Sequence, residues 1–247
     1  MRQPIVIDKR FCGPKASANG GYAAGVFARV IDGPAEVTLK APTPFNAPIE
    51  FRKGEGGAYA ALCGGTEIAS MKPAAIVVET PPAPDAQDVL AAREAYLADK
   101  AMTLIYPYCF VCGKNREEGD GLRIFAGATP DGPVNADYWT PHVSLADDAG
   151  LVSPEYLWAA LDCPSAFALR GGKNPVLLGR FSADIARRPK AGERLTVAAW
   201  RTGVDGRKHY SSSAIYDAAG AVIAAANAVW IEIKDPALIA KLRAENE

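Results

Sequence analysis

The sequence has 247 residues, of which 49% are hydrophobic and 22% are charged, as in a globular protein that is large enough to bury a core. It carries 27 lysine and arginine residues against 28 aspartate and glutamate residues, so the formal net charge is -1. This balance argues against a surface for nucleic acid or for an anionic membrane, because either would require clustered excess positive charge.

Two further classes of architecture are excluded. No window approaches the roughly 20 uninterrupted apolar residues that span a bilayer, and the first residues lack the long apolar stretch of a secretory signal. Five cysteines are an odd number and too few for a disulfide scaffold in a chain of this length. We therefore expect a cytoplasmic protein with reduced thiols and no membrane partner.

The first half predicts one helix and a series of short strands. Residues 19–31 form the helix, because apolar side chains recur on one of its faces; these are Tyr22, Ala23, Val26, Phe27 and Val30. Glycine and proline turns separate the predicted strands, which cover residues 35–40, 49–52, 58–62, 67–71 and 74–79. The proline-rich residues 80–84 predict an extended connector, and Asp85 is a candidate cap for a surface helix behind it.

The second half predicts the same order of elements. A strand at residues 122–126 and an aromatic-rich segment at 136–139 precede a helix that starts at about Ser153. Four long strands follow at residues 176–185, 194–201, 208–216 and 222–233, with turns at 204–206 and 217–220. Asp235 and Pro236 are typical of the start of a short helix.

One helix followed by a run of antiparallel strands thus occurs twice, which is typical of an α+β fold in which a sheet wraps around a helix. We predict an N-terminal unit over residues 1–84 and a helical linker over 85–108. A C-terminal unit over residues 109–234 and a helical tail over 235–247 complete the predicted organisation.

Three segments of the second half carry a resemblance to a known family. They read Cys-Phe-Val-Cys-Gly at 109–113 with Gly-Leu-Arg at 121–123, Arg-Pro-Lys-Ala-Gly-Glu-Arg-Leu at 188–195, and Asp-Ala-Ala-Gly-Ala-Val-Ile-Ala at 217–224. Together they resemble bacterial hot-dog-fold acyl-CoA thioesterases of the phenylacetyl-CoA type. The first half, in which Asn-Gly-Gly-Tyr at 19–22 opens the helix, resembles the N-terminal unit of a double hot-dog thioesterase. The resemblance implies a double hot-dog fold, with two central helices against a continuous antiparallel sheet.

The resemblance also implies where the site lies. In this family the central helix usually begins with His or Asn and two glycines, an acidic residue follows nine positions later, and each site takes one part from each unit. The first helix keeps Asn19, Gly20 and Gly21 but has Ala28 at the acidic position. The second has Asp162 at the acidic position. Its opening residues are Ser153, Pro154 and Glu155 instead of the usual motif. The resemblance therefore implies one composite site, in which residues 19–21 of the first helix meet Asp162 of the second. The opposite pairing, of residues 153–155 with Ala28, lacks the groups that the family uses.

Thioester hydrolysis requires these groups because negative charge develops on the carbonyl oxygen. Gly20 and Gly21 would form an oxyanion hole at the helix N-terminus, where each N–H donor contributes about 10²–10³ in rate. Asn19 would position the substrate, and Asp162, whose pKa burial should raise, would act as general base or nucleophile. Tyr22 and Ser165 are further candidates for the pocket, and Arg187 and Arg188 for contacts with the phosphates of CoA. An acyl-CoA or acyl-carrier thioester is the expected substrate, without a cofactor or metal.

Other interpretations of the same residues remain open. Asn19 to Gly21 could be only a helix cap, and Asp162, which lies near Pro164, could be only structural. A non-catalytic acyl-CoA-binding protein is therefore one alternative. A hot-dog enoyl-CoA hydratase is another, because Asp137 and His142 have the spacing that such enzymes use.

The remaining chemistry-bearing residues predict no site of their own. Cys109 and Cys112 could be half of a zinc site, but no second such pair accompanies them and Cys163 stands apart in the sequence. His209 is predicted at an exposed strand position. Exposed sheet edges make a homodimer of such double units a further expectation.

Overall fold

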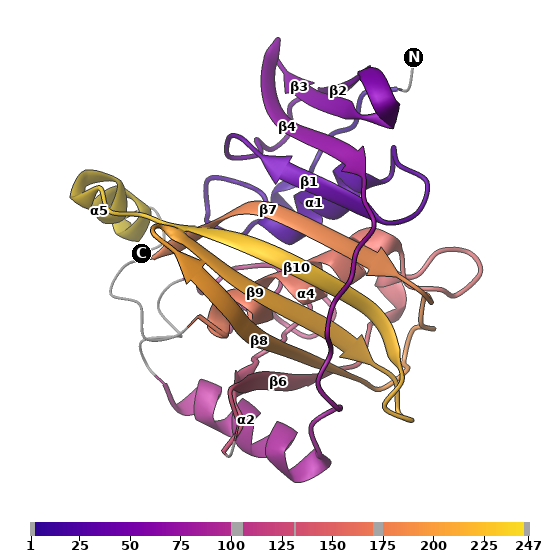
Figure 1. Ribbon diagram of the computed structural model, residues 1–247, viewed down its shortest axis with the longest axis vertical. Coiled ribbons are helices and arrows are strands. Elements are labelled where there is room, and N and C mark those ends of the chain that lie inside the picture. Colours follow the sequence, from indigo (N-terminus) through magenta and orange to yellow (C-terminus); the bar gives the residue numbers. More distant parts are fainter. Residues whose placement is uncertain (1–2, 100–105, 131, 170–174, 245–247) are drawn as a thin grey trace.

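The computed structural model describes residues 3–99, 106–130, 132–169 and 175–244. Within these ranges ten strands form one sheet in the order β2-β3-β4-β1-β7-β10-β9-β8-β6-β5 (Figure 1). The strands are β1 (Ala35–Leu39), β2 (Ile49–Lys53), β3 (Tyr59–Cys63), β4 (Thr66–Pro73), β5 (Gly127–Ala128), β6 (Val134–Trp139), β7 (Val176–Ile185), β8 (Leu195–Asp205), β9 (Lys208–Tyr216) and β10 (Val222–Glu232). The helices are α1 (Gly20–Ala28), α2 (Ala86–Ala98), α4 (Pro154–Phe167) and α5 (Pro236–Ala244).

The sheet is continuous because the two halves of the chain join edge to edge. β1 of the first half pairs antiparallel with β7 of the second half, from Ala35 opposite Ala183 to Thr38 opposite Arg180. Every other neighbouring pair of strands is antiparallel as well. The predicted α+β class, with helices packed against one antiparallel sheet, is confirmed.

The two central helices lie side by side and run in opposite directions. Gly21, near the start of α1, faces Asp162 in the second half of α4, and Gly25 faces Glu155 near the start of α4. The helix α1 is therefore enclosed between α4 and the sheet, and its residues from Gly21 to Ala28 are all buried. The sequence predicted that one apolar face of this helix is buried, whereas the structure buries the helix on all sides.

Two of the predicted strands are wrong. Residues 74–79 belong to no strand; they run along the C-terminal part of the sheet towards α2 (Figure 1). Asn227 donates a side-chain hydrogen bond to the Val77 carbonyl (3.1 Å), and Tyr216 donates one to the Pro81 carbonyl (2.9 Å). In the sheet, β4 lies between β3 and β1, and β1 lies between β4 and β7, so neither strand has an unpaired edge beside it. The segment after β4 therefore crosses a face of the sheet to reach the opposite edge, where β5 and β6 lie.

Residues 122–126 are the second such segment. They are buried, except for a half-buried Arg123, but belong to no strand of the sheet. The amides of Leu122 and Ile124 donate instead to the carbonyls of Phe110 and Val111, at 2.8 and 3.0 Å. An apolar segment can therefore be buried without pairing to a strand if another loop accepts the hydrogen bonds of its backbone amides.

The linker helix begins where the sequence predicts. Asp85 caps α2 by accepting a hydrogen bond from the Asp88 amide at 2.9 Å. The helix covers the β5–β6 edge of the sheet and buries Val89, Ala92 and Tyr96 (Figure 1). In the described ranges, no helix has both the length and the apolar character that a bilayer crossing requires.

The contact between α1 and α4 generates a test of how closely the helices must pack. A Cβ at Gly25 would lie 2.7 Å from both Glu155 Cα and Trp158 Cβ. We expect Gly25→Ala to lower the free energy of unfolding by about 1–3 kcal/mol in urea titrations, although alanine favours helices. Gly203→Ala is the control, because its Cβ would meet nothing closer than Tyr210 Cδ2 at 3.7 Å. Equal stability of the two variants would contradict the close contact.

Candidate active site

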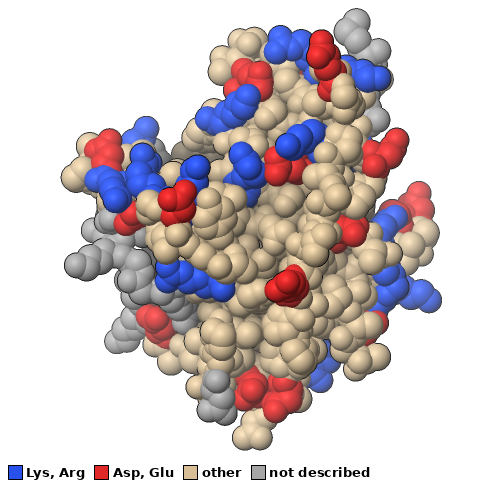
Figure 2. Space-filling view, in the orientation of Figure 1, with Lys and Arg blue, Asp and Glu red and all other residues tan. Residues whose placement is uncertain are grey.

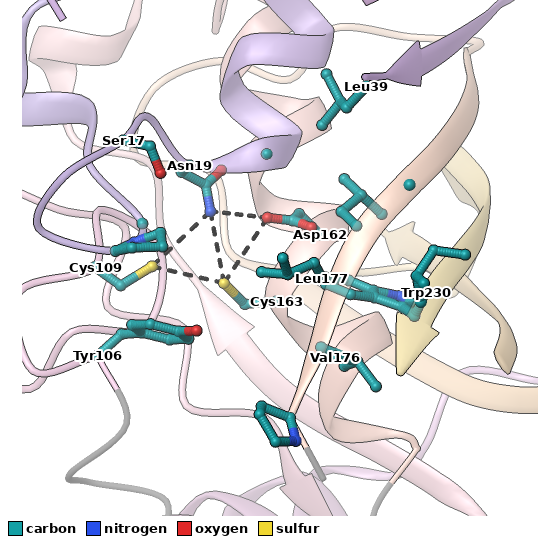
Figure 3. Close-up of a pocket in the computed structure, with 18 of the residues that line it drawn as sticks. Ser17, Asn19, Leu39, Tyr106, Cys109, Asp162, Cys163, Val176, Leu177 and Trp230 are labelled. Carbon is teal, nitrogen blue, oxygen red and sulfur yellow. Dashed lines mark hydrogen bonds between the residues drawn. The ribbon is translucent and has the colours of Figure 1, made fainter. Parts of the chain in front are cut away.

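A cavity of about 500 Å³ lies between the N-terminus of α1, the second half of α4 and the strands β7 and β10. Most of its wall is apolar, and one end is polar (Figure 3). The apolar wall includes Leu39, Phe167, Val176, Leu177, Leu178 and Trp230. The polar end includes Asn19, Asp162 and three cysteines. The cavity therefore combines room for an apolar group with a small set of converging polar groups, as ligand sites commonly do.

Asn19 connects the two central helices at the polar end. Its Oδ1 accepts a hydrogen bond from the Tyr22 amide at 2.8 Å and so caps α1. Its Nδ2 donates to Asp162 Oδ2 at 2.8 Å (Figure 3). One side chain thus caps α1 and holds the carboxylate that α4 supplies.

The two glycines after Asn19 have different surroundings. Gly20 lines the cavity, but Gly21 does not. A Cβ at Gly21 would lie 2.3 Å from Asp162 Cβ and 2.8 Å from the Trp158 carbonyl oxygen. Glycine at position 21 is therefore what allows Asp162 to approach the start of α1.

Asp162 is 2% exposed, and its Oδ1 has no hydrogen-bond partner among the described residues. Burial raises the pKa of Asp162 to about 7. A negative charge on the neighbouring Cys109 sulfur also raises this pKa, whereas the Gly21 amide and the Asn19 side chain lower it. Because burial dominates, the carboxylate is a stronger base than an exposed aspartate and still has one free oxygen.

Three buried thiols lie beside this carboxylate. The sulfur atoms of Cys109, Cys112 and Cys163 all lie within 4.8 Å of one another. Cys163 Sγ is 3.7 Å from Cys109 Sγ and 4.0 Å from Asp162 Oδ2 (Figure 3). Hydrogen bonds from the other two thiols lower the pKa of Cys109, and the same contacts with Cys109 raise the pKa of Cys112 and of Cys163.

Cys163 stands apart from the other two cysteines in the sequence, but the structure brings its sulfur close to theirs. The turn that carries Cys109 and Cys112 packs against α4, and this long-range contact leaves no trace in residue spacing. One signal was present in the sequence, because Cys163 directly follows the candidate acidic residue Asp162.

Tyr22 and Ser165, which were also candidates for the pocket, make their contacts within the core. Tyr22 stacks on Phe11 with ring centroids 4.0 Å apart. Ser165 donates to the Asp162 carbonyl at 2.7 Å and accepts from Trp230 Nε1 at 3.1 Å. Neither residue lines the cavity, because packing against aromatic and backbone groups turns both side chains into the core.

The arginines predicted to contact CoA phosphates are also not at the cavity. Arg187 pairs with Glu193 at 2.7 Å and with Asp217 at 3.3 Å. Arg188 pairs with Asp147 at 2.6 Å. Acidic partners thus already neutralise both arginines, and basic and acidic side chains are interspersed over the face shown in Figure 2. Of the described residues that line the cavity, Lys40 is the one lysine or arginine.

The pair expected of a hydratase is not assembled. Asp137 is buried and accepts hydrogen bonds from Arg93 at 2.6 Å and from the Phe125 amide at 2.5 Å. His142 is exposed and contacts Ser144. Neither lines the cavity. The histidine that does line it is His209, which the sequence placed at an exposed position; its Nε2 is buried without a partner among the described residues.

The opposite pairing of the two helices contains an ion pair. Glu155 lies 3.7 Å from Arg29 and is buried, and Ala28 occupies the position where the family has an acidic residue. None of these residues, nor Ser153, lines the cavity. The two ends of the helix pair therefore differ in their chemistry.

No protein-family model matches the sequence, and no curated protein sequence matches it. Solved structures do match. The tesB protein of Mycobacterium avium subspecies paratuberculosis has a TM-score of 0.56 at 15% identity, over 90% of this chain and 89% of that one. A candidate thioesterase II of Thermobifida fusca has 0.59 at 15%, over 94% and 93%.

A third match is a protein of unknown function with a hot dog fold from Alicyclobacillus acidocaldarius. It has a TM-score of 0.59 at 11% identity, over 94% of this chain and 93% of that one. Together the three likenesses show that the chain has the hot-dog fold over most of its length. At these identities they show the fold alone.

The burial of Asp162 generates a prediction for stability. Because the pKa of Asp162 is raised to about 7 in the folded protein, folding favours the protonated form. The stabilisation from that proton is complete below about pH 4 and is lost as the pH rises through about 7. Between about pH 5 and pH 8, we expect wild type to lose roughly 2–3 kcal/mol of unfolding free energy relative to Asp162→Asn.

Urea titrations in buffer with a chelator and a reductant measure this difference, since three thiols lie beside the carboxylate. A difference in unfolding free energy between wild type and Asp162→Asn that stays the same at both pH values would contradict the raised pKa.

Proposed function

We propose that this chain hydrolyses an acyl thioester at a single site formed by α1 and α4. The observation that carries the proposal is the contact of Asn19, at the start of α1, with Asp162 of α4 at the polar end of an apolar cavity. Solved structures with the same fold include the tesB protein and the candidate thioesterase II described above, which supports this class of reaction.

The cavity supplies the binding part of the proposal. Its apolar wall accepts the acyl group, and burying each methylene contributes about 0.8 kcal/mol. The thioester carbonyl then lies at the polar end, where Gly20, the first residue of α1, lines the cavity. The first N–H groups of a helix lack partners within the helix and form the positive end of its dipole, so the Gly20 amide stabilises the developing oxyanion.

Asp162 supplies the base. Its buried Oδ1, which has no hydrogen-bond partner among the described residues, accepts a proton from a water molecule while the water oxygen attacks the carbonyl carbon. The carbonyl electrons move to oxygen and return as the carbon–sulfur bond breaks. The proton held by Asp162 then passes to the departing thiolate, which leaves a carboxylic acid and a free thiol.

Asn19 and Gly21 act through Asp162 in this scheme. Both polar atoms of Asn19 are engaged within the protein, so it orients the carboxylate and does not contact the substrate. Gly21 lies behind the carboxylate and outside the cavity wall. Gly20 is therefore the glycine that contacts the substrate, and Gly21 is a positioning residue.

We expect Asp162→Asn to lower kcat for thioester hydrolysis by about 10² or more with little change in KM, because the base is lost while the cavity remains. Thiol release from a panel of acyl-CoA and acyl-carrier thioesters measures this effect. His142→Ala is the control and should retain full activity, because His142 is exposed and does not line the cavity.

Equal, low activity of wild type and Asp162→Asn would favour an acyl-CoA-binding protein without catalysis. Hydration of crotonyl-CoA that His142→Ala abolishes would favour a hydratase. Either result contradicts the proposal.

Chain-length preference tests the role of the apolar wall. Ala166 lines the cavity, so Ala166→Phe fills part of it. Excluding two or three methylenes lowers kcat/KM for long acyl chains about tenfold or more, and acetyl thioesters are affected little. Ala219→Phe is the matched control at an exposed turn. A uniform loss with all chain lengths would show that the cavity does not hold the acyl group.

A further inference from the structure

The hydrolytic scheme leaves three chemically reactive side chains unused. Cys109, Cys112 and Cys163 are buried, yet all three line the cavity beside Asp162. We propose that these three thiols bind one thiolate-preferring divalent metal ion of the zinc class, and that its fourth coordination position faces the cavity. The proposal does not depend on thioester hydrolysis.

The spacing of the sulfur atoms fits such an ion. Zinc–sulfur bonds of about 2.3 Å in a tetrahedral site place two thiolates about 3.8 Å apart. Cys109 Sγ and Cys163 Sγ are 3.7 Å apart, and no pair among the three sulfurs exceeds 4.8 Å. Binding therefore requires a closing movement on the order of 1 Å or less.

The turn that carries two of the thiols has a closely packed backbone. The Gly113 amide donates to the Cys109 carbonyl at 2.9 Å, and a Cβ at Gly113 would lie 2.5 Å from that oxygen, so only glycine fits. This contact fixes the turn on which Cys109 and Cys112 lie.

The bound site would carry a small net charge, which Asn19 can stabilise. Metal binding breaks three S–H bonds and releases three protons, so a divalent ion with three thiolates carries one negative charge. Asn19 Nδ2 lies 3.9 Å from Cys109 Sγ and 3.7 Å from Cys163 Sγ, and offers its N–H groups to that charge. No oxidant or reductant takes part.

The fourth position is open to a small ligand. Within the part of the chain that the structure describes, no further cysteine, histidine or carboxylate belongs to this group. Sites with three protein ligands and an open position are typical of zinc that binds water or a substrate atom. In this chain that position opens beside Asp162.

Cobalt binding tests the proposal directly. The full chain is purified in reductant, freed of metal with a chelator, and titrated with Co²⁺ alone. We expect one ion per chain, with thiolate-to-cobalt charge-transfer bands and the visible bands of a four-coordinate ion. Zinc should displace the cobalt one for one. These readouts do not involve turnover, so they are independent of whether the chain hydrolyses thioesters.

Variants and alkylation assign the ligands. Cys109→Ser, Cys112→Ser and Cys163→Ser should each weaken cobalt binding at least 100-fold, and Cys63→Ser, whose thiol lies outside the cluster, should bind as wild type does. Circular dichroism monitors folding. If a variant does not fold, the wild-type chain is alkylated with and without zinc and analysed by mass spectrometry. Zinc should protect residues 109, 112 and 163 from alkylation but not residue 63.

Three results would overturn the proposal. These are a reduced wild-type chain that binds no cobalt, a spectrum and alkylation pattern that involve fewer than three thiols, and a disulfide between Cys109 and Cys163 that persists in the reductant.

Discussion

The close antiparallel contact between α1 and α4 is the constraint on which the rest of the structure depends. Gly21 and Gly25 lie at this contact, and a Cβ at either position would come within 3 Å of α4. Because the helices approach so closely, the cap residue of one reaches the carboxylate of the other, and Asn19 joins Asp162. The same approach encloses α1, and the cavity lies where this helix starts.

The polar end of that cavity concentrates groups that an apolar core would otherwise exclude. Asp162 is buried with one oxygen unpaired, and three thiols and an amide surround its other oxygen or lie near it. Each of these groups costs stability unless it is satisfied. The neighbouring sheet and helices are apolar and closely packed, so they can tolerate this local cost, which is common where a fold carries a functional site.

Much of the fold could be predicted, and the failures have a common physical cause. The bounds of β7 and β9 follow from alternation and turn residues, and those strands occur where the sequence predicts them. Residues 74–79 and 122–126 have equally strand-like composition but lie outside the sheet. Local pattern indicates that a segment is extended or buried, but its hydrogen-bond partners are determined by topology.

The same distinction applies to the site. The pairing of Asn19 with Asp162 could be anticipated from the resemblance to hot-dog thioesterases, which implies a site that takes one part from each helix, and the two side chains do meet. The neighbourhood of Cys163 and the position of Gly21 behind the carboxylate depend on tertiary packing alone. At the other end of the helix pair, Glu155 and Arg29 form an ion pair, and neither residue lines the cavity. Polar groups thus line a cavity at one end of the helix pair, and the other end holds a buried ion-paired glutamate.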